Sequence, residues 1–512
     1  MNSRAGGHDV HDVVVVGAGP NGLTAAICLA RAGLSTLVIE GQEEPGGGCR
    51  SQALTLPGFV HDTCSTVHPL GMSSPVFRAF GLDRFGLEWI EPPVCLAHLL
   101  SDGRAVLMHE SLAATAEGLG PDGAAYVELF EPFVRDFDRL MAMILGPLRF
   151  PSDSRLLARF GWVALQSLER MCRARFQGAG APALLAGIAA HAMLPLDWTA
   201  TASFALVLGA AAHRVGWPLA RGGSRAITDA LVACLRSHGG ELLLGTPVER
   251  REQLPAARAY LFDVTPRQLL GILGEALPRG YAQRLRRFRY GPGVFKMDWA
   301  LSGPIPWKDA RIRQAATVHL SGSLAEVSAG EAAVHADSIP GRPFTLLVQP
   351  SLFDPTRAPP SQHTAWAYCH VPHGSTWDAS ESIEAHIERF APGFRSLIRA
   401  RATKNSLEME RFNANYVGGD INGGLADITQ LLFRPVTRAD PYSTALDNVF
   451  LCSSSTPPGG GVHGMCGYWA ARSALRRLFP ERLPELVELL AEPRAAPAAT
   501  RAASAARPHA AE

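Results

Sequence analysis

VVVVGAGPNG, residues 13–22, is the stretch that decides the fold. Its four valines fit a strand buried on both faces, because β-branched side chains pack well on a pleated surface that is covered from both sides. Residues 23–33 then have the composition of a helix that ends at a glycine cap, and STLVIE, residues 35–40, fits a second strand. Strand, glycine turn, helix and strand in this order predict a βαβ unit that binds a dinucleotide.

The glycines of this turn each have a physical reason. The first makes the tight turn, the second lets a pyrophosphate approach the backbone, and the third allows the helix to pack closely. The positive end of the helix meets the phosphates, and an acid at the end of the second strand accepts hydrogen bonds from the adenosine ribose. The residues assigned to this part of the site are Gly17, Gly19, Pro20, Asn21, Gly22 and Glu40.

Two further segments favour FAD over NAD. EPGGGCRS, residues 44–51, places a second glycine cluster just after the ribose acid, which an NAD domain does not require. Residues 447–475 fit a strand, a loop rich in proline and glycine, and a helix beginning near Gly464. The backbone N–H groups of that helix end suit the ring edge where a reduced flavin carries negative charge. A glycine loop that merely caps a structural helix stays open as the alternative.

Composition narrows the class of protein. A chain of 512 residues exceeds the usual size of one hydrophobic core, so two domains are expected. A net charge of +1 with 19% charged residues excludes a nucleic-acid partner and favours a small molecule. Nine cysteines without a CxxC pair fit reduced thiols, with neither a disulfide framework nor a zinc site. No signal peptide is recognised, so a cytoplasmic protein is expected.

The two most apolar stretches, residues 183–196 and 199–212, are too short to cross a bilayer. They are interpreted as buried helices of a substrate domain, and peripheral contact with a membrane surface is left open.

Strand, turn and helix signals recur in three separated blocks, so the cofactor domain is predicted to be discontinuous. The fold class is α/β, with a Rossmann-like FAD-binding domain and a second α+β substrate domain that contains helices and a mixed or antiparallel sheet. The FAD-binding domain is assigned to residues 9–70, 216–270 and 440–480, and the substrate domain to residues 71–215 and 271–439. Residues 493–512, rich in Ala, Pro and Arg, are predicted to be a disordered tail.

These motifs together resemble the FAD-binding amine oxidase and phytoene desaturase superfamily, and most closely its phytoene-dehydrogenase-like branch. The resemblance spans nearly all of residues 10–480. It is carried by VVVVGAGPNGL, LTLPGFVHDTCSTVHPL (54–70), GWPLARGGSRAITDAL (216–231), RYGPGVFKMDWALSGPIPW (289–307), NYVGGDINGG (415–424) and CSSSTPPGGGVHGMCGY (452–468).

The resemblance implies further cofactor contacts. Gly47, Gly48 and Arg50 touch FAD, and the backbone at Val248 contacts adenine, although the stretch after Val248 is shorter than the strand meander of the family. The residues placed beside the flavin are Gly461, Val462 and His463. A second fingerprint is not recognised, since GAGAPA at 178–183 follows no strand. NADPH is therefore not expected, and oxygen or a quinone is predicted as the electron acceptor.

GVFKMDWAL, residues 293–301, supplies the first candidate catalytic group. A strand period of two puts Phe295, Met297 and Trp299 on one face, interpreted as core, and Lys296 and Asp298 on the other. If that second face lines the cavity, Lys296 resembles the lysine that amine oxidases hold near flavin N5, where a cation positions water for reoxidation. A solvated lysine–aspartate pair is the alternative.

His68 and His191 are the other candidates, as proton acceptors during dehydrogenation, against the alternative of ordinary interior histidines. HDTCSTVH, residues 61–68, matches no zinc spacing, so no metal is assigned. Cys466 is interpreted as a packed thiol and not as a covalent flavin tether.

The predicted function is an FAD-dependent dehydrogenase or oxidase that takes a hydride from a C–H bond onto flavin N5. The resemblance implies desaturation of a lipophilic or secondary-metabolite substrate. The alternatives are an amine or alcohol oxidase that produces hydrogen peroxide, a redox-neutral flavin isomerase, and a catalytically silent flavoprotein that binds a partner or lipid.

Overall fold

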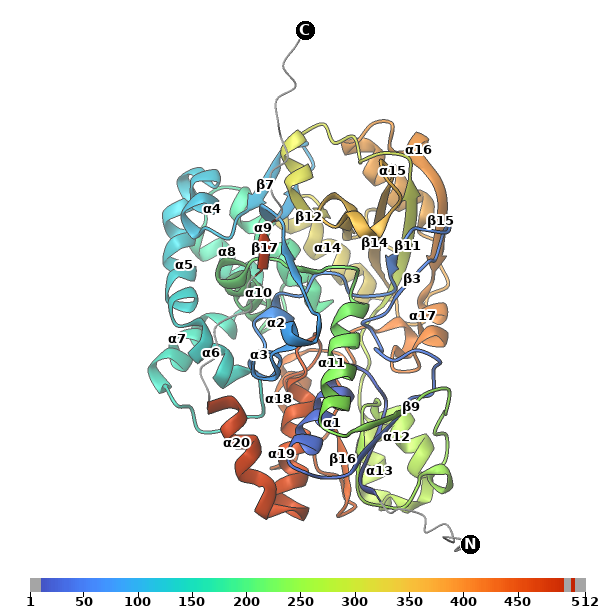
Figure 1. The fold of residues 1–512 in the computed structure, drawn as a ribbon. Coiled ribbons are helices and arrows are strands. Elements are labelled where there is room, and N and C mark those ends of the chain that lie inside the picture. Colours follow the sequence, from blue (N-terminus) through green and yellow to red (C-terminus); the bar gives the residue numbers. More distant parts are fainter. Residues whose placement is uncertain (1–10, 492–498, 502–512) are drawn as a thin grey trace, which may run out of the picture.

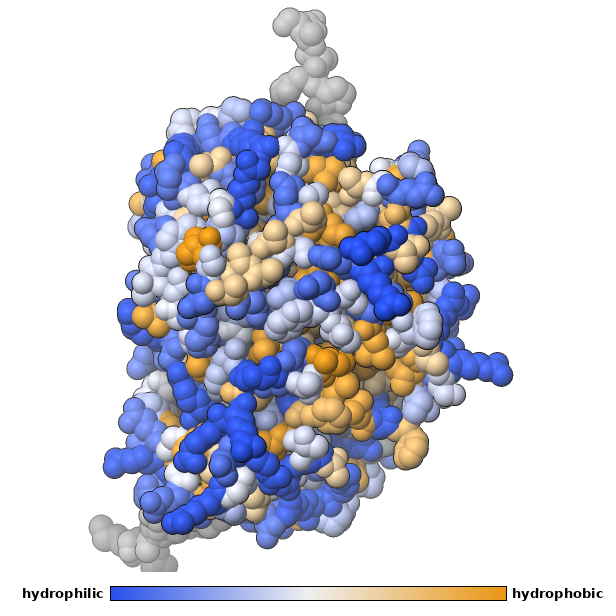
Figure 2. Space-filling view, turned by 180° about the vertical axis from the view of Figure 1, so that it is seen from behind, coloured by the Kyte–Doolittle hydropathy of each residue, from blue (hydrophilic) through white to orange (hydrophobic). Residues whose placement is uncertain are grey.

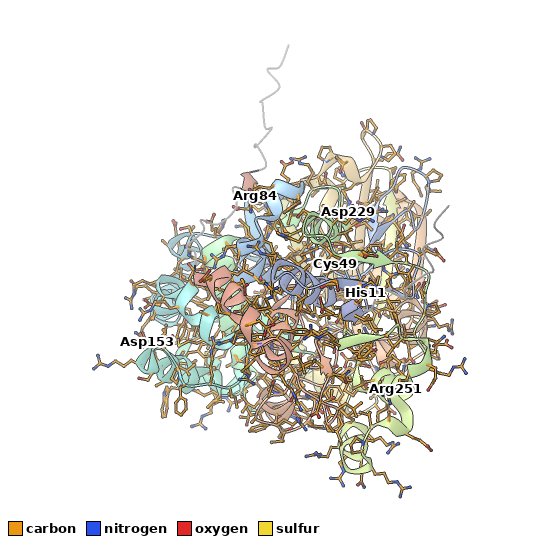
Figure 3. The ribbon with its side chains drawn as sticks, turned by 60° about the horizontal axis from the view of Figure 1, so that its bottom comes forward. His11, Cys49, Arg84, Asp153, Asp229 and Arg251 are labelled. Carbon is orange, nitrogen blue, oxygen red and sulfur yellow. The ribbon has the colours of Figure 1, made fainter. Side chains whose placement is uncertain are left out.

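A computed structural model describes residues 11–491 and 499–501 of the chain. Figure 1 shows a βα layer at the bottom, a large sheet at the upper right and a group of helices, α4 to α8, along the left side. Asp153 caps α7 (Ser154–Ala164), and Arg251 follows β9 (Glu241–Leu243). The two residues lie on opposite sides of the view in Figure 3.

The βα layer contains, among the described residues, five parallel strands drawn from remote parts of the chain. The strand order is β16-β10-β1-β2-β9. The predicted first domain segment contributes β1 and β2, the second contributes β9 and β10, and the third contributes β16, so the three segments share one sheet. Their bounds are β16 Val449–Leu451, β10 Ala257–Phe262, β1 His11–Val16, β2 Thr36–Ile39 and β9 Glu241–Leu243.

The first strand is buried on both faces, as its valines predict. Val13 and Val15 pack into the core cluster on one side of the sheet, while Val14 and Val16 pack into the cluster on the other side. The side of Val13 is covered by α1 (Pro20–Arg31), α11 (Arg225–Ser237) and α19 (Met465–Leu478). The side of Val14 is covered by α12 (Pro266–Leu273) and α13 (Arg279–Arg286).

The helices α1 and α19 meet closely, although they come from opposite ends of the chain (Figure 1). A Cβ atom at Gly467 would overlap the carbonyl oxygen of Asn21, and one at Gly464 would overlap Oγ1 of Thr24. Glycine at both positions therefore permits the contact that brings the C-terminal loop against the first glycine turn.

A second sheet contains, within the same described part of the chain, seven strands of mixed direction. Their order is β15-β11-β14-β13-β12-β6-β7. One face packs on α15 (Ser380–Phe390) and the other is overlaid by α9 (Gly180–Ala189) and α14 (Leu324–His335). The strands are β15 Ile398–Lys404, β11 Gly293–Leu301, β14 His363–Val371, β13 Thr345–Val348, β12 Ala315–Leu320, β6 Val94–Leu99 and β7 Ala105–Met108.

Shorter elements complete the described fold. The remaining helices are α2 Pro69–Met72, α3 Pro75–Phe80, α4 Leu112–Gly118, α5 Gly123–Arg135, α6 Phe137–Ile144, α7 Ser154–Ala164, α8 Leu168–Arg175, α10 Ala202–Val215, α16 Phe394–Leu397, α17 Ser406–Phe412, α18 Ile428–Phe433 and α20 Leu483–Ala491. The remaining strands are β3 Ser51–Gln52, β4 His61–Asp62, β5 Trp89–Glu91, β8 Leu219–Ala220 and β17 Ala499–Arg501.

Two predictions concern regions outside these elements. The tail assigned to residues 493–512 lies outside the described residues except for β17, which pairs with β5. Between β9 and β10 the described chain holds a single 3-10 turn at Arg251–Gln253, so this connection is as short as its sequence indicates. Among the described helices, none combines the length and the apolar composition needed to cross a bilayer.

Candidate active site

A cavity of about 660 Å³ joins the two sheets. One end is lined by Gly19, Pro20 and Asn21 of the first glycine turn and by the C-terminal loop at 460–463. The other end runs between apolar helices α7, α10 and α18. Segments from both ends of the chain and from its middle therefore share one enclosed space.

The first glycine turn approaches its neighbours too closely for side chains. Gly17 has φ of +100°, which disfavours other residues, and a Cβ atom at Gly19 would lie 2.6 Å from Oδ2 of Asp263. The N–H of Gly22 donates to that same oxygen at 2.9 Å. Burial raises the pKa of Asp263 to about 7.

The second glycine cluster packs directly on the first. A Cβ atom at Gly47 would lie 3.2 Å from Cα of Gly19, and one at Gly48 would lie 2.5 Å from the hydroxyl of Tyr416. Both Gly47 and Gly48 line the cavity, as the sequence predicts. This bare backbone surface is a cradle that added Cβ atoms would fill, and it fits the pyrophosphate of a dinucleotide.

Several predicted contacts lie beside the cavity and not on its wall. Gly17, Gly22, Glu40, Arg50 and Val248 are absent from the described lining. Glu40 accepts the N–H of Ala18 at 2.7 Å, so it supports the turn from the end of β2.

Arg50 is buried and donates to the carbonyl oxygens of Gly47, at 3.1 Å, and Phe412, at 3.2 Å. Val248 is half-buried against the cluster below the sheet. Their roles toward a cofactor stay predictions.

The C-terminal loop completes the glycine end of the cavity. Gly461, Val462 and His463 line it, just before α19 begins at Met465, next to the predicted Gly464. Nδ1 of His463 accepts the N–H of Met465 at 3.0 Å, and burial lowers the pKa of His463 to about 4. This ring is therefore neutral at pH 7 and holds the helix end in place. Cys466 is a buried thiol outside the described lining.

Lys296 faces the cavity, on the opposite side of β11 from Phe295, Met297 and Trp299, as the strand period predicts. Its Nζ donates to Oδ1 of Asp298 at 2.5 Å. The two side chains are each only 2% exposed, so the alternative of a solvated pair is wrong. The ammonium group lies 4.9 Å from the ring centre of Trp366, another lining residue.

His68 and His191 both line the cavity. Nε2 of His68 and Nδ1 of His191 are buried and make no hydrogen bond within the described structure. Burial lowers the pKa of each ring to about 4, so both are neutral at pH 7 and able to accept a proton. The geometry does not choose between them.

Sequence reasoning missed Asp263 and the residues around it. The backbone of Asp263 accepts a hydrogen bond from Nδ2 of Asn415 at 3.0 Å, and both residues line the cavity together with Tyr416. Asp263 directly follows β10, at the carboxyl edge of the parallel sheet where ligands bind in this fold. An acidic residue directly after a buried parallel strand is a feature of the sequence that could have indicated this part of the site.

The far end of the cavity is apolar. Its wall is formed by side chains of α7, α10 and α18 and of the loop before α7, including Leu157, Phe160, Phe204, Val207, Leu208, Leu431 and Leu432. Leu148 and Leu165 line this end and are also 66% and 54% exposed, so the cavity reaches the surface there. Asp263, at the glycine end, is the one carboxylate among the described lining residues.

A dinucleotide-binding sheet, a second mixed sheet and a cavity between them define a two-part oxidoreductase fold. The NAD(P)-binding Rossmann-like domain family matches residues 15–81.

The chain is 25% identical to rat pyridine nucleotide-disulfide oxidoreductase domain-containing protein 2, over 91% of this chain and 94% of that protein. It is 23% identical to the lycopene-forming phytoene desaturase of Paracoccus sp., over 89% and 95% respectively. A solved structure of a putrescine oxidase double mutant shares the fold, with a TM-score of 0.58 and 16% identity over 94% of this chain and 99% of that one. The predicted likeness to the phytoene desaturase and amine oxidase superfamily is confirmed, with desaturases similar in sequence and amine oxidases similar in fold.

Proposed function

We propose that the protein is an FAD-dependent dehydrogenase that desaturates a lipophilic small molecule. FAD, when bound, supplies the capacity to take a hydride from a C–H bond. The observation that carries the proposal is the composition of the cavity, which is bare backbone at one end and hydrocarbon at the other.

The cofactor contacts follow from that arrangement. Gly19, Gly47 and Gly48 would present backbone to the pyrophosphate, and Glu40, which supports the turn beside the cavity, would hold the ribose. The loop at 461–463 and the N-terminal end of α19 would hold the flavin ring. Nζ of Lys296 donates a hydrogen bond to Asp298 at the cavity wall, and His68 or His191 accepts the proton lost from substrate.

Charge favours a neutral substrate over an amine. An amine is a cation at pH 7, and burying it without a carboxylate partner is costly. The apolar end of the described cavity offers no carboxylate, since Asp263 lies at the glycine end. This observation ranks a desaturase above an amine oxidase, and an alcohol oxidase stays a second candidate.

The mouth of the cavity supports entry of a lipophilic molecule. Besides Leu148 and Leu165, the exposed apolar residues near it include Phe150 and Trp162, on and before α7. Figure 2 shows hydrophobic residues gathered in the lower right part of the face seen from behind, the side on which α7 lies. Large apolar groups around a mouth suit transfer of substrate from a lipid phase, so peripheral membrane contact belongs to the proposal.

The deciding experiment is anaerobic bleaching of the flavin absorbance. The purified protein is reconstituted with FAD and mixed with polyenes and other terpenoids, with primary amines and with alcohols. The proposal expects bleaching by a lipophilic C–H donor and by none of the amines. Bleaching by amines alone, or a protein that stays colourless after incubation with FAD, would overturn it.

Product analysis then separates the alternatives. Stoichiometric hydrogen peroxide under air identifies an oxidase, and its absence with reoxidation by a quinone identifies a dehydrogenase. Turnover without consumption of any acceptor indicates an isomerase. A bound flavin that no compound reduces indicates a silent flavoprotein.

A further inference from the structure

A cluster of buried histidines beside the cavity has unusual hydrogen bonding. Five imidazole nitrogen atoms of four rings make no hydrogen bond within the described structure: Nδ1 of His98, Nδ1 of His191, both nitrogens of His319 and Nε2 of His370. Buried polar atoms in folded proteins are nearly always bonded to protein or to ordered water. The expected partner of these ring nitrogens is then ordered water or a transferred proton.

Three of these rings form a row that leads away from the cavity. His191 lines the cavity, and its ring centre lies 5.5 Å from that of His319. The ring of His319 lies 5.8 Å from that of His98. His319 on β12 and His98 on β6 are register partners in parallel strands, so both side chains project from the same face of the sheet.

Gly187 on α9 leaves open the space between two members of this row. A Cβ atom there would collide with Nδ1 of His319 and would lie 2.5 Å from Nδ1 of His98. The two nitrogens therefore lie beside the same point of α9 and within about 5 Å of each other, a separation that one water molecule bridges. The missing side chain lets α9 approach both rings without displacing either.

The hydrogen bond of His98, at the far end of the row, defines the tautomer of its ring. Nε2 of His98 lies 2.6 Å from the carbonyl oxygen of Gly322. A carbonyl oxygen only accepts, so Nε2 carries the hydrogen and Nδ1 presents its lone pair toward His319. Ser101 and Glu326 pack against Gly322, and the Glu326 side chain is 40% exposed, so the row ends close to the surface.

We propose that His191, His319 and His98 form a proton route from the cavity to the surface beside Glu326. This inference rests on the proposed dehydrogenation, in which the substrate loses one hydrogen as a hydride to FAD and a second as a proton. The electron pair of the second C–H bond forms the new double bond. The proton passes to His191, and each ring releases a proton from one nitrogen as it accepts one on the other. His98 passes the last proton from Nε2, when its bond to Gly322 opens, to the partly exposed carboxylate of Glu326, which releases it to water.

Burial sets the resting state of the rings. It lowers the pKa of His191 and of His98 to about 4, and it lowers the pKa of His319 well below the usual range, with the neighbouring His98 and His191 adding to the effect. All three rings are therefore neutral at pH 7, and a protonated ring in the route is transient. His370 lies beside the row but outside it, because its Nδ1 is bonded to Glu331 at 2.7 Å.

Two substitutions interrupt the row in different ways. His319→Phe keeps an aromatic ring but removes both nitrogens, while Gly187→Ala keeps every imidazole and puts a methyl group between two of them. With a substrate found by bleaching, each variant should reduce its flavin about tenfold more slowly and with a larger solvent isotope effect, at unchanged substrate affinity. Equal rates and isotope effects in both variants and the unaltered protein would overturn the route.

The controls are a second buried histidine and a second helical glycine. His213→Phe removes a buried ring whose two nitrogens have partners, Tyr126 and the Glu110 carbonyl. Gly271→Ala adds a methyl group within α12, where a Cβ atom meets no other atom within 4 Å. Neither control should change the rate of flavin reduction. Slowing by the controls as large as in the row variants would assign the effect to general destabilisation and reject the route.

A second measurement needs no substrate. Deuterium exchange at C2 of each histidine, followed by mass spectrometry, requires that the ring be reached by protons and water. His98, His191 and His319 should exchange about tenfold faster than buried His213, and Gly187→Ala should slow His98. If all four rings exchange equally slowly, water does not reach the row and the proposed route is rejected. If no compound bleaches the flavin, the proposed function fails, and the exchange measurement still decides the row.

Discussion

The two ends of the cavity are built by different means. At the glycine end, residues 19–21 and 47–48 make the surface, and its shape follows from missing Cβ atoms at neighbouring positions in sequence. At the apolar end, side chains from α7, α10 and α18 meet across long stretches of chain. A local motif therefore specifies the first end, whereas tertiary packing specifies the second.

The largest effect is expected from closing the glycine end. Gly19→Glu places a charged side chain where even a Cβ atom lies 2.6 Å from Asp263, in the path of the pyrophosphate. Flavin binding should be lost, as measured by the absorbance of the purified variant after incubation with FAD. Gly271→Glu, in open space on α12, should keep its flavin. A yellow Gly19→Glu protein would show that this turn does not bind the cofactor.

The next largest effect is expected at a buried ion pair that joins the two predicted domains. Asp62 follows the glycine clusters and is fully buried, with Arg357 of the substrate part at 2.8 Å and the hydroxyls of Ser51 and Thr66 also bonded to it. These partners hold the pKa of Asp62 well below its usual range.

Asp62→Ala leaves the Arg357 charge buried and unpaired, so the free energy of unfolding should fall by about 3 to 5 kcal/mol. Urea denaturation measures it. Removing the exposed carboxylate of a surface ion pair in Glu381→Ala should cost less than about 1 kcal/mol, and equal losses in the two variants would refute the special role of Asp62.

The carboxyl group at the glycine end should make stability depend on pH. The pKa of Asp263 is about 7 in the folded protein and 3.8 when unfolded, so the folded state binds the proton more tightly. The free energy of unfolding therefore falls when this buried carboxyl group ionises. The loss is absent below pH 4, grows as the pH rises from 4 to 7, and reaches about 4 kcal/mol at most. Urea denaturation of the flavin-free protein across this range should show the loss, and Asp263→Asn should flatten it. An unchanged slope in the variant would exclude Asp263 as the source.

The sequence predicted those features that depend on local pattern. The burial of four consecutive valines follows from their β-branched side chains, and the separation of Lys296 from the apolar face of its strand follows from the period of two. The close approach at Gly19 follows from the glycine spacing. The pairing of His319 with His98 was not predictable, because register between strands so far apart in sequence depends on the whole sheet. Asp263 was not predicted, because one acidic residue after a strand does not by itself indicate a site, and its contact with the first glycine turn depends on the pairing of β1 with β10.

The smallest effect is expected at Lys296, on the wall of the cavity. Lys296→Met should keep the flavin and the fold, because the buried Asp298, whose pKa is already raised by burial, then becomes protonated and neutral. If the ammonium group positions water for the reaction with oxygen, reoxidation in stopped-flow absorbance should slow about tenfold.

Lys404→Met is the matched control, since Lys404 is the register partner of Lys296 on β15 but does not line the cavity. Removing a cation from this neighbourhood without touching the cavity wall separates a general electrostatic effect from a local one. Equal slowing in both variants would assign the effect to the field of the two lysines together, while an unchanged rate in Lys296→Met would remove that residue from the oxidative step. Slowing in Lys296→Met alone would show that Lys296 acts locally, at the wall of the cavity, in the reaction of the reduced flavin with oxygen.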